Sequence, residues 1–384
     1  MDFEPTETQQ LIMRTARDFA QRELMPVAAE LDRESRFPSE QVKALAELGL
    51  MGVNIPAELG GAEAGVVAYS LAMMEVARGC ASTSVTMAVT NMVGEVISYF
   101  GSEDQRQKYV PKLTSGEYAA GAFSLSEPGA GSDAAGMTTQ ATRTDGGWVL
   151  DGQKMWITSG GKCGVMVVWA RTDTPSNRVG HKGISCFLVE QGTPGLKVEK
   201  KEDKMGLRGS ETVPLTFDEC HLPADALLGE EGQGFRIAMM ALDGGRIGIA
   251  SQAVGVATAA LEEGLEYAKD RKQFRKPIAD FQAIQWMIAD SKTELEAARL
   301  LALRAAKLKE QGAKSFSREA ATAKVFASEA AWRICDRMLQ VHGGYGYVRD
   351  FAIERHLRDI RVARIYEGTS EVQRTVIARS LLRG

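Results

Sequence analysis

The spacing of apolar residues changes twice along this 384-residue chain, and the change limits the folds that it can adopt. Residues 1–120 carry apolar side chains at helical intervals, for example Val42, Leu45 and Leu48. Residues 123–220 instead hold short strand-like runs, and helical spacing returns from about residue 234. The pattern therefore predicts helices, then a sheet, then helices, in an α+β fold.

The central zone contains an Asp-Gly pair between two apolar runs. Residues 148–150 and 153–157 flank Asp151-Gly152, and this pair favours the type I′ turn of a β-hairpin. We also expect strands at 165–169, 184–189 and 213–217. No helical stretch interrupts them, so the zone is predicted to be an all-β insert.

The last zone holds two unusually long helical patterns, over 281–311 and 316–341, which stop at Gly312 and at Gly343-Gly344. Helices of nearly 30 residues far exceed the usual mean of about 11–12 residues. Because short loops join them, we expect an antiparallel helix bundle.

Composition excludes several classes of protein. The net charge of −4 argues against a nucleic-acid partner, and no apolar run reaches the roughly 20 residues needed for membrane insertion. The N-terminus lacks a secretory signal pattern. Five dispersed cysteines without a C-x-x-C pair predict neither a disulfide framework nor a metal site. We expect a cytoplasmic location, or the mitochondrial matrix for a processed eukaryotic form.

A lone carboxylate near the C-terminus, in Tyr366-Glu367-Gly368-Thr369-Ser370, is the first candidate for chemistry. Ser370 and Gln373 have the spacing of a capping box, which predicts a helix that begins there. Glu367 would then lie in a short loop facing the positive end of a helix dipole, which favours its ionised form. Glu367 is therefore a candidate base, and a solvated loop glutamate is the alternative.

Two segments of the central zone could contact a flat ligand. Residues 123–133 run from a short strand into a glycine turn that exposes backbone amides, without a P-loop or dinucleotide fingerprint. Trp156 and Thr158 alternate along a strand, so an indole and a hydroxyl would face the same side. The alternatives are a tight structural turn and a core tryptophan.

Three further segments carry charge or glycine. Asp243-Gly244-Gly245-Arg246 is expected to enter a helix, where Arg246 would need an anionic partner, either a salt bridge or a ligand. The basic turn 271–275 suits a pyrophosphate, although most such turns are only solvated. Residues 340–346 end a helix with a glycine pair, for which a plain C-cap is the alternative.

Together the motifs resemble those of the acyl-CoA dehydrogenases in order and spacing, over essentially the whole chain. They are Ser-Glu-Pro-Gly-x-Gly-Ser-Asp, Trp-Ile-Thr, Arg-Lys-x-Phe, Gln-x-x-Gly-Gly-x-Gly and Tyr-Glu-Gly-Thr-Ser. The resemblance implies an N-terminal helical domain (1–120), a central antiparallel β-barrel (121–232) and a C-terminal four-helix bundle (233–384). It also implies FAD-dependent oxidation of an acyl-CoA substrate to the trans-2-enoyl-CoA, electron transfer to an electron-transfer flavoprotein, and a homotetramer built as a dimer of dimers.

The resemblance assigns roles residue by residue. Glu367 would take the α-proton while flavin N5 accepts the β-hydride, and Gly245 occupies the position where two branches of the family carry their base, so it cannot serve. Substrate contacts would come from Ser132, Asp243, Arg246, Glu367 and Gly368. The FAD contacts would be Phe123, Leu125, Ser126, Ser132, Trp156, Ile157, Thr158, Arg271, Phe274, Gln282, Gln340, Gly343, Gly344, Thr369 and Glu371, with those at 271–274 and 340–344 reaching a neighbouring subunit's FAD.

The substrate is less determined. The segments 201–210 and 246–252 look most like the short-chain, butyryl-type branch, and residues 86–100 are expected to form the pocket floor. Glu95 in that segment either points away from the acyl tail or indicates a modified acyl group. The alternatives are a branched, cyclic or aryl thioester, an oxygen-reducing oxidase, and a non-catalytic CoA-binding protein on the same fold.

Overall fold

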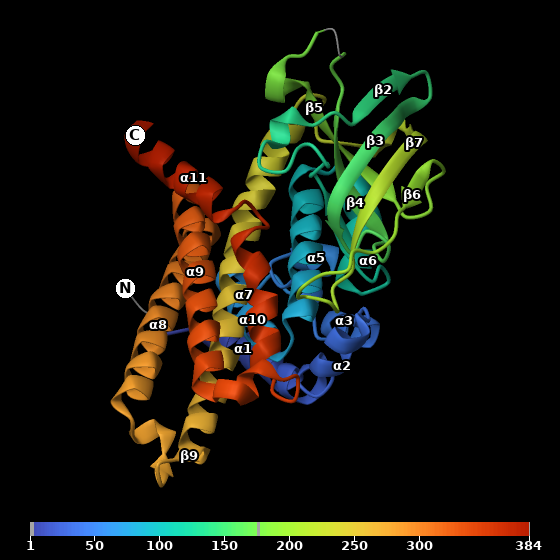
Figure 1. The fold of residues 1–384 in the computed structure, drawn as a ribbon. Helices are drawn as coiled ribbons and strands as arrows, with labels where there is room; N and C mark the ends of the chain where they lie inside the picture. Colours follow the sequence, from blue (N-terminus) through green and yellow to red (C-terminus); the bar gives the residue numbers. More distant parts are fainter. Residues whose placement is uncertain (1–3, 175–176, 384) are drawn as a thin grey trace.

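The computed structural model describes residues 4–174 and 177–383, and it shows two helical parts with a sheet between them in sequence (Figure 1). The N-terminal helices are α1 (Glu7–Phe19), α2 (Ala28–Glu34), α3 (Ser39–Glu47), α4 (Gly65–Gly79), α5 (Ala81–Phe100) and α6 (Glu103–Thr114). The C-terminal helices are α7 (Gly234–Asp270), α8 (Gln282–Glu310), α9 (Ser317–His342), α10 (Ile353–Ile360) and α11 (Ser370–Arg383). The predicted helix–sheet–helix order is confirmed.

The sheet has eight strands in the order β6-β7-β3-β2-β4-β5-β8, with β1 paired to β4. The strands are β1 (Gly121–Ser124), β2 (Gln140–Thr144), β3 (Gly147–Thr158), β4 (Val165–Arg171), β5 (Ile184–Glu190), β6 (Leu196–Val198), β7 (Thr212–Pro223) and β8 (Leu227–Leu228). Most pairs are antiparallel, as expected, but β4 runs parallel to both β1 and β2.

The predicted turn at Asp151-Gly152 is wrong. β3 runs straight through this pair, with a register shift between Leu150 and Gly152, and the hairpin turn lies between β2 and β3 at Asp145-Gly146. A Cβ atom at Gly152 would approach Thr139 Cα to 2.7 Å. The glycine at 152 is therefore required by a close approach of backbones, and the same dipeptide six residues earlier makes the turn.

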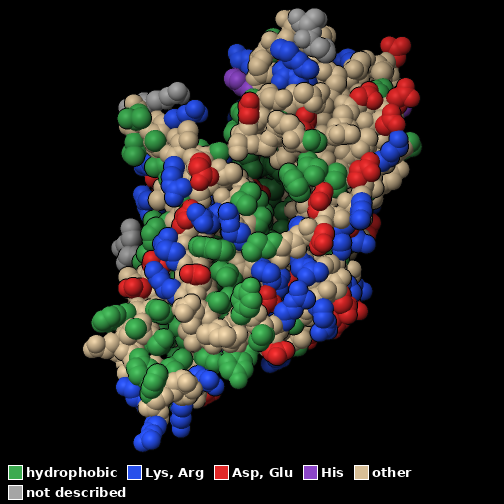
Figure 2. Space-filling view, viewed as in Figure 1, with side chains coloured by type: hydrophobic (Ala, Val, Ile, Leu, Met, Phe, Trp, Pro, Cys, Tyr) green, Lys and Arg blue, Asp and Glu red, His purple; other side chains and the backbone are tan. Residues whose placement is uncertain are grey.

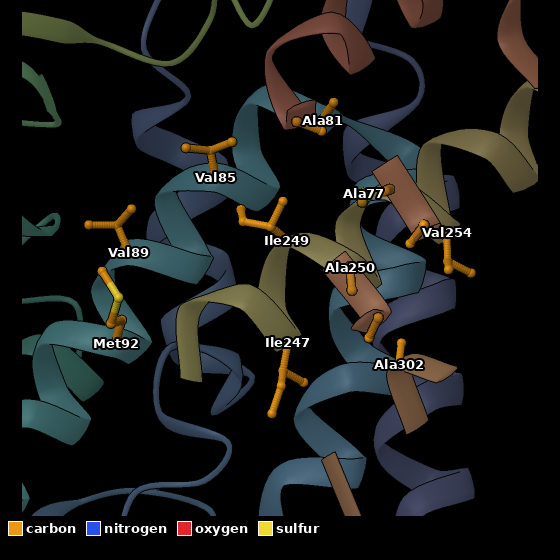
Figure 3. Close-up of a cluster of buried hydrophobic side chains, with 14 of the residues drawn as sticks. Ala77, Ala81, Val85, Val89, Met92, Ile247, Ile249, Ala250, Val254 and Ala302 are labelled. Atoms are coloured by element: carbon orange, nitrogen blue, oxygen red, sulfur yellow. The ribbon is translucent and has the colours of Figure 1, made fainter. Parts of the chain in front are cut away.

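Side chains of β4 alternate between two hydrophobic cores. Val165, Val167 and Trp169 pack with the helices, whereas Met166 and Val168 belong to a core enclosed by the sheet itself. The helix-facing cluster extends from the sheet through α5 and α7 to α8 and α9, and Figure 3 shows α5 and α7 side chains interleaved. Because this core is continuous, the sheet and the two sets of helices hold one another in place.

The long helices confirm the predicted bundle, since α8 and α9 begin and end within one or two residues of the expected limits. α7, α8 and α9 pack on one another, α4 packs on α7 and α8, and α11 packs on α9. The expected helix start at Asp243 is wrong, because α7 begins at Gly234 and continues through both glycines. Arg246 therefore lies more than three turns inside the helix, where the dipole has little effect.

Candidate active site

The surface is hollowed between the sheet and the helices, near the segment that precedes α11 (Figure 2). Residues 366–369 form this segment and connect the short 3₁₀ turn after α10 to α11. Glu367 and Gly368 have φ values of +53° and +87°. A non-glycine residue in this left-handed region is uncommon and must be held there by its surroundings.

Two buried donors hold the turn from opposite sides. The Nζ atom of Lys324 in α9 donates to the Gly368 carbonyl at 2.6 Å. The Nε2 atom of Gln373 in α11 lies 3.1 Å from the Glu367 carbonyl and 3.0 Å from that of Gly368. These contacts fix the backbone of the candidate base.

The capping box predicted at Ser370 is wrong. The backbone N–H of Val372 donates to Thr369 Oγ1 at 3.3 Å, whereas Ser370 Oγ is buried without a partner among the residues that the structure describes. The helix begins at Ser370, so the preceding threonine is its N-cap. Gln373 binds the carbonyls of the turn, a role that its spacing from Ser370 did not indicate.

The Glu367 carboxyl group is poised to exchange a proton at neutral pH. Burial raises its pKa to about 7, although the positive charges of Arg246 and Lys324 oppose the rise. Its Oε2 atom is buried and has no hydrogen-bond partner within the described chain. Burial therefore outweighs the helix dipole that we expected to keep this group fully ionised.

Arg246 already has an anionic partner in its own helix. Its Nη1 atom lies 2.5 Å from Asp243 Oδ1, and Ser317 Oγ donates to the other oxygen of Asp243. The salt-bridge alternative is thus present in the structure. The Nε atom of Arg246 is nevertheless buried and unpartnered among the described residues, which leaves one donor for a ligand.

Gly245 makes room for the base. A Cβ atom at this position would lie 2.7 Å from Glu367 Oε2 and 3.0 Å from the sulfur of Met92 in α5. The first distance is shorter than real Cβ atoms show and the second is very tight, so a side chain at position 245 would displace the Glu367 carboxyl group.

Gly245→Ala is expected to slow flavin reduction about 100-fold, because displacing a reacting group by about 1 Å costs this much. The rate would be measured anaerobically with saturating acyl-CoA. Gly244→Ala is the matched control, since its Cβ atom would meet the flexible end of Lys309 at 2.6 Å and Glu95 Oε2 at 3.4 Å, and not the Glu367 carboxyl group. Equal rates in the two variants would show that Gly245 has no special role.

A small cavity of about 10 Å³ is lined in part by Gly244 and Gly245. Its lining includes an ion pair in which Lys309 Nζ of α8 lies 2.5 Å from Glu95 Oε1 of α5. The lining residues are Asn54, Val66, Tyr69, Asn91, Met92, Glu95, Gly244, Gly245 and Lys309. Glu95 thus faces the cavity with its charge balanced by a lysine, which our sequence interpretation did not anticipate.

On the sheet side, Trp156 is not a core residue. A register shift between Lys154 and Ile157 accompanies its left-handed conformation, and 59% of the residue is exposed. Phe123 contacts the ring of Trp169, and the Ser126 carbonyl accepts from Met155 N–H at 2.9 Å. The glycine turn after β1 and the Trp-Ile-Thr segment are therefore neighbours.

A buried ion pair supports that neighbourhood, and sequence reasoning missed it. Lys154 Nζ lies 2.9 Å from Glu127 Oε1 and 3.1 Å from the Leu125 carbonyl, and both side chains are almost fully buried. Glu127 also accepts from the backbone of Thr138 and Thr139. Burial alone would raise the pKa of Glu127, but Lys154 and these donors lower it to about 2.

The other predicted cofactor residues lie at the far end of the bundle. Arg271 follows the last residue of α7, and its guanidinium lies 5.3 Å from the ring centroid of Tyr345, next to the Gly343-Gly344 pair. Phe274, Gln282, Gln340, Gly343 and Gly344 are all exposed. Since 24 helical residues separate Arg246 from Asp270, this end lies roughly 36 Å from Glu367 along α7.

Within the described residues, no helix is long and apolar enough to cross a membrane, and no group of His, Cys, Asp or Glu side chains is arranged to hold a metal ion.

Comparison with known proteins defines the class. The chain matches the acyl-CoA dehydrogenase N-terminal, middle and C-terminal domains over residues 6–117, 122–220 and 232–382. The short-chain specific acyl-CoA dehydrogenase of Bos taurus mitochondria is 51% identical over 98% of this chain and 90% of that protein. The chain belongs to the acyl-CoA dehydrogenase family.

Two solved structures share the whole fold. The butyryl-CoA dehydrogenase of Megasphaera elsdenii is 43% identical, with a TM-score of 0.97 and full coverage of both chains. A chain from work on the electron transferring flavoprotein of Acidaminococcus fermentans is 42% identical, again with a TM-score of 0.97 and full coverage. As a family member, the protein is an FAD-dependent oxidoreductase that acts on acyl-CoA.

Proposed function

We propose that this protein oxidises a short-chain acyl-CoA to the trans-2-enoyl-CoA, with Glu367 as the base that removes the α-proton. The observation that carries the proposal is the Glu367 carboxyl group itself. Its buried Oε2 atom, beside Gly245, has no hydrogen-bond partner in the described part of the chain, and burial raises the pKa of Glu367 to about 7. A base is most effective when its pKa lies near the operating pH.

The rigid turn supports a second task. The thioester oxygen gains negative charge as the α-proton leaves, and the backbone N–H of Glu367 would donate to it. FAD, when bound, supplies at N5 the acceptor for the hydride that leaves the β-carbon. Lys324 and Gln373 keep both groups of Glu367 in one geometry, because they bind the carbonyls of the turn.

The sheet-side residues fit a flat ring system. An exposed indole at Trp156 and the partly buried ring of Phe123 provide a stacking surface. We assign the flavin ring to Phe123, Leu125, Ser126, Trp156 and Thr158, closed by Thr369 and Glu371. Ile157 is buried in the sheet's own core, so it would contribute only its backbone.

A homotetramer accounts for the remaining FAD residues. Arg271, Phe274, Gln282, Gln340, Gly343 and Gly344 are too far from Glu367 to share one cofactor ring in a single chain. All of them except the partly buried Arg271 are exposed, at one end of the bundle. We therefore assign them to the FAD of a neighbouring subunit. Ser132, Asp243, Arg246 and Gly368 are assigned to the acyl-CoA.

The residues around Gly244 and Gly245 favour a short acyl chain. Met92 lies against Gly245, and the Glu95–Lys309 pair lies over Gly244, so little room remains beyond the reacting carbons. The balanced charge of Glu95 removes the need for a modified acyl group. The relatives named for short-chain acyl-CoA and butyryl-CoA agree, and the structure from the electron transferring flavoprotein work supports such a protein as electron acceptor.

The decisive experiment is anaerobic bleaching of the purified yellow protein by butyryl-, isobutyryl-, hexanoyl-, octanoyl- and benzylic CoA thioesters. We expect fastest bleaching with butyryl-CoA and a fall of at least tenfold by octanoyl-CoA. A protein that no acyl-CoA bleaches would overturn the proposal, and rapid reoxidation by oxygen with product bound would indicate an oxidase.

A further inference from the structure

Lys324 is a buried lysine that contacts the turn carrying the candidate base. It lies in α9 with 0% of the residue exposed, and its Nζ atom donates to the Gly368 carbonyl at 2.6 Å. Within the described chain, no carboxylate forms an ion pair with this ammonium group. A charge that is buried without an ionic partner is costly, so its presence calls for a reason beyond packing.

Anchoring the turn does not require that charge. Gln373, a neutral side chain, donates to the same carbonyl at 3.0 Å. What an ammonium group adds is a positive charge close to the Glu367 carboxyl group. The other cation beside that carboxyl group, Arg246, is already balanced by Asp243 at 2.5 Å.

We propose, on the basis of the function proposed above, that Lys324 is a positioning residue that fixes the Glu367 turn and favours the ionised form of the base. Its charge favours the carboxylate before the proton is transferred, and the carbonyl contact holds the carboxylate where it meets Gly245. This role is distinct from that of Gln373, which supplies only the hydrogen bonds.

Other charged and titratable groups surround Glu367 and Lys324. Arg246 and Asp243 of α7 form an ion pair, and burial raises the pKa of Tyr69 from α4 and of Tyr366 well above its usual value. Burial lowers the pKa of Lys324 to about 8, and the carboxylates of Glu367, Glu329 and Glu371 oppose the fall while Arg246 adds to it. Glu95 is balanced by Lys309.

Lys324→Gln tests the role because it can still donate to Gly368 but carries no charge. We expect the pKa of Glu367 to rise by about 1–2 units, as for the loss of an opposite charge at close range. The rate of flavin reduction by butyryl-CoA, measured between pH 6 and 9, should then rise at a pH that is higher by the same 1–2 units. Infrared pH titration of the carboxyl band without acyl-CoA gives a second readout, with the Glu367→Gln spectrum identifying the band.

Two controls separate charge from geometry. Gln373→Met removes the neutral donor and should leave the pKa of Glu367 within about 0.3 units of the wild-type value. Lys324→Arg keeps a positive charge and should also give a pKa close to that of the wild type. A folded Lys324→Gln variant with an unshifted carboxyl midpoint overturns the proposal. If no acyl-CoA bleaches the wild-type protein, the proposed function fails, but the infrared titration still decides on Lys324.

If Lys324→Gln does not fold, the pKa of Lys324 in the Glu367→Gln variant tests the proposal instead. Glu367→Gln removes the negative charge beside the ammonium group, so the pKa of Lys324 should fall by the same 1–2 units, as linkage requires. NMR of lysine labelled with ¹³C at Cε would follow this titration, with the Lys324→Arg spectrum assigning the signal. An unchanged Lys324 midpoint would contradict the proposal.

Discussion

Glu367→Gln should retain bound flavin and acyl-CoA affinity while losing flavin reduction by about 10⁴-fold, the upper end of what a positioned base contributes. Gln matches Glu in shape, and no hydrogen bond to Oε2 is lost, because that atom has no partner in the described structure. Position 245, next to the Glu367 carboxyl group, is a glycine and offers no carboxylate that could replace it. Stopped-flow absorbance under anaerobic conditions measures the change.

Stability shows whether this variant has kept its fold. The pKa of Glu367 is raised by burial in the folded state to about 7, so the ionised carboxylate destabilises the fold progressively from about pH 4.5 to pH 7. Glu367→Gln should therefore increase the free energy of unfolding at pH 8 by up to about 3 kcal/mol and have little effect at pH 4. Rapid flavin reduction by a stable variant would place the base elsewhere.

Lys154→Met is expected to destabilise the protein by about 3–5 kcal/mol, because it leaves the Glu127 carboxylate buried without its counter-ion. The same change removes the donor to the Leu125 carbonyl, so we also expect much of the yellow colour to be lost on purification. Thermal unfolding and the flavin-to-protein absorbance ratio measure the two effects.

Two comparisons make the Lys154 result specific. Lys197→Met breaks an exposed pair with Asp218, and such pairs contribute less than about 1 kcal/mol. The double variant Glu127→Gln/Lys154→Met removes both charges and should recover part of the lost stability. If Lys154→Met were no more harmful than Lys197→Met, the buried pair would not support the flavin side of the site.

Local pattern was sufficient for the helices and most of the strands. The limits of α8 and α9 followed from apolar spacing and from Gly312 and Gly343, because long amphipathic helices carry the same signal in every turn. The sequence did not locate the hairpin turn, because two positions carry the same turn-forming dipeptide. Asp145-Gly146 and Asp151-Gly152 are equivalent as dipeptides, and only the backbone approach to Thr139 distinguishes them.

Motifs in the sequence located the candidate site, but they did not predict its ion pairs or the pKa of its base. The pairs Lys154–Glu127, Lys309–Glu95 and the Lys324–Gly368 contact join residues 27, 214 and 44 positions apart in sequence. No periodicity or motif predicts which lysine meets which acceptor at such separations. Likewise, the raised pKa of Glu367 comes from burial between helices, which becomes visible only when the elements are packed.

The separation of the base from the pocket wall has an evolutionary consequence. Met92 and Glu95 lie on α5, whereas Glu367 is held by α9 and α11, so different elements carry the two functions. Substitutions along one face of α5 can therefore change which acyl chains fit without disturbing proton transfer. A fold of this kind can diversify its substrates by drift and selection at a single helix while its chemistry stays constant.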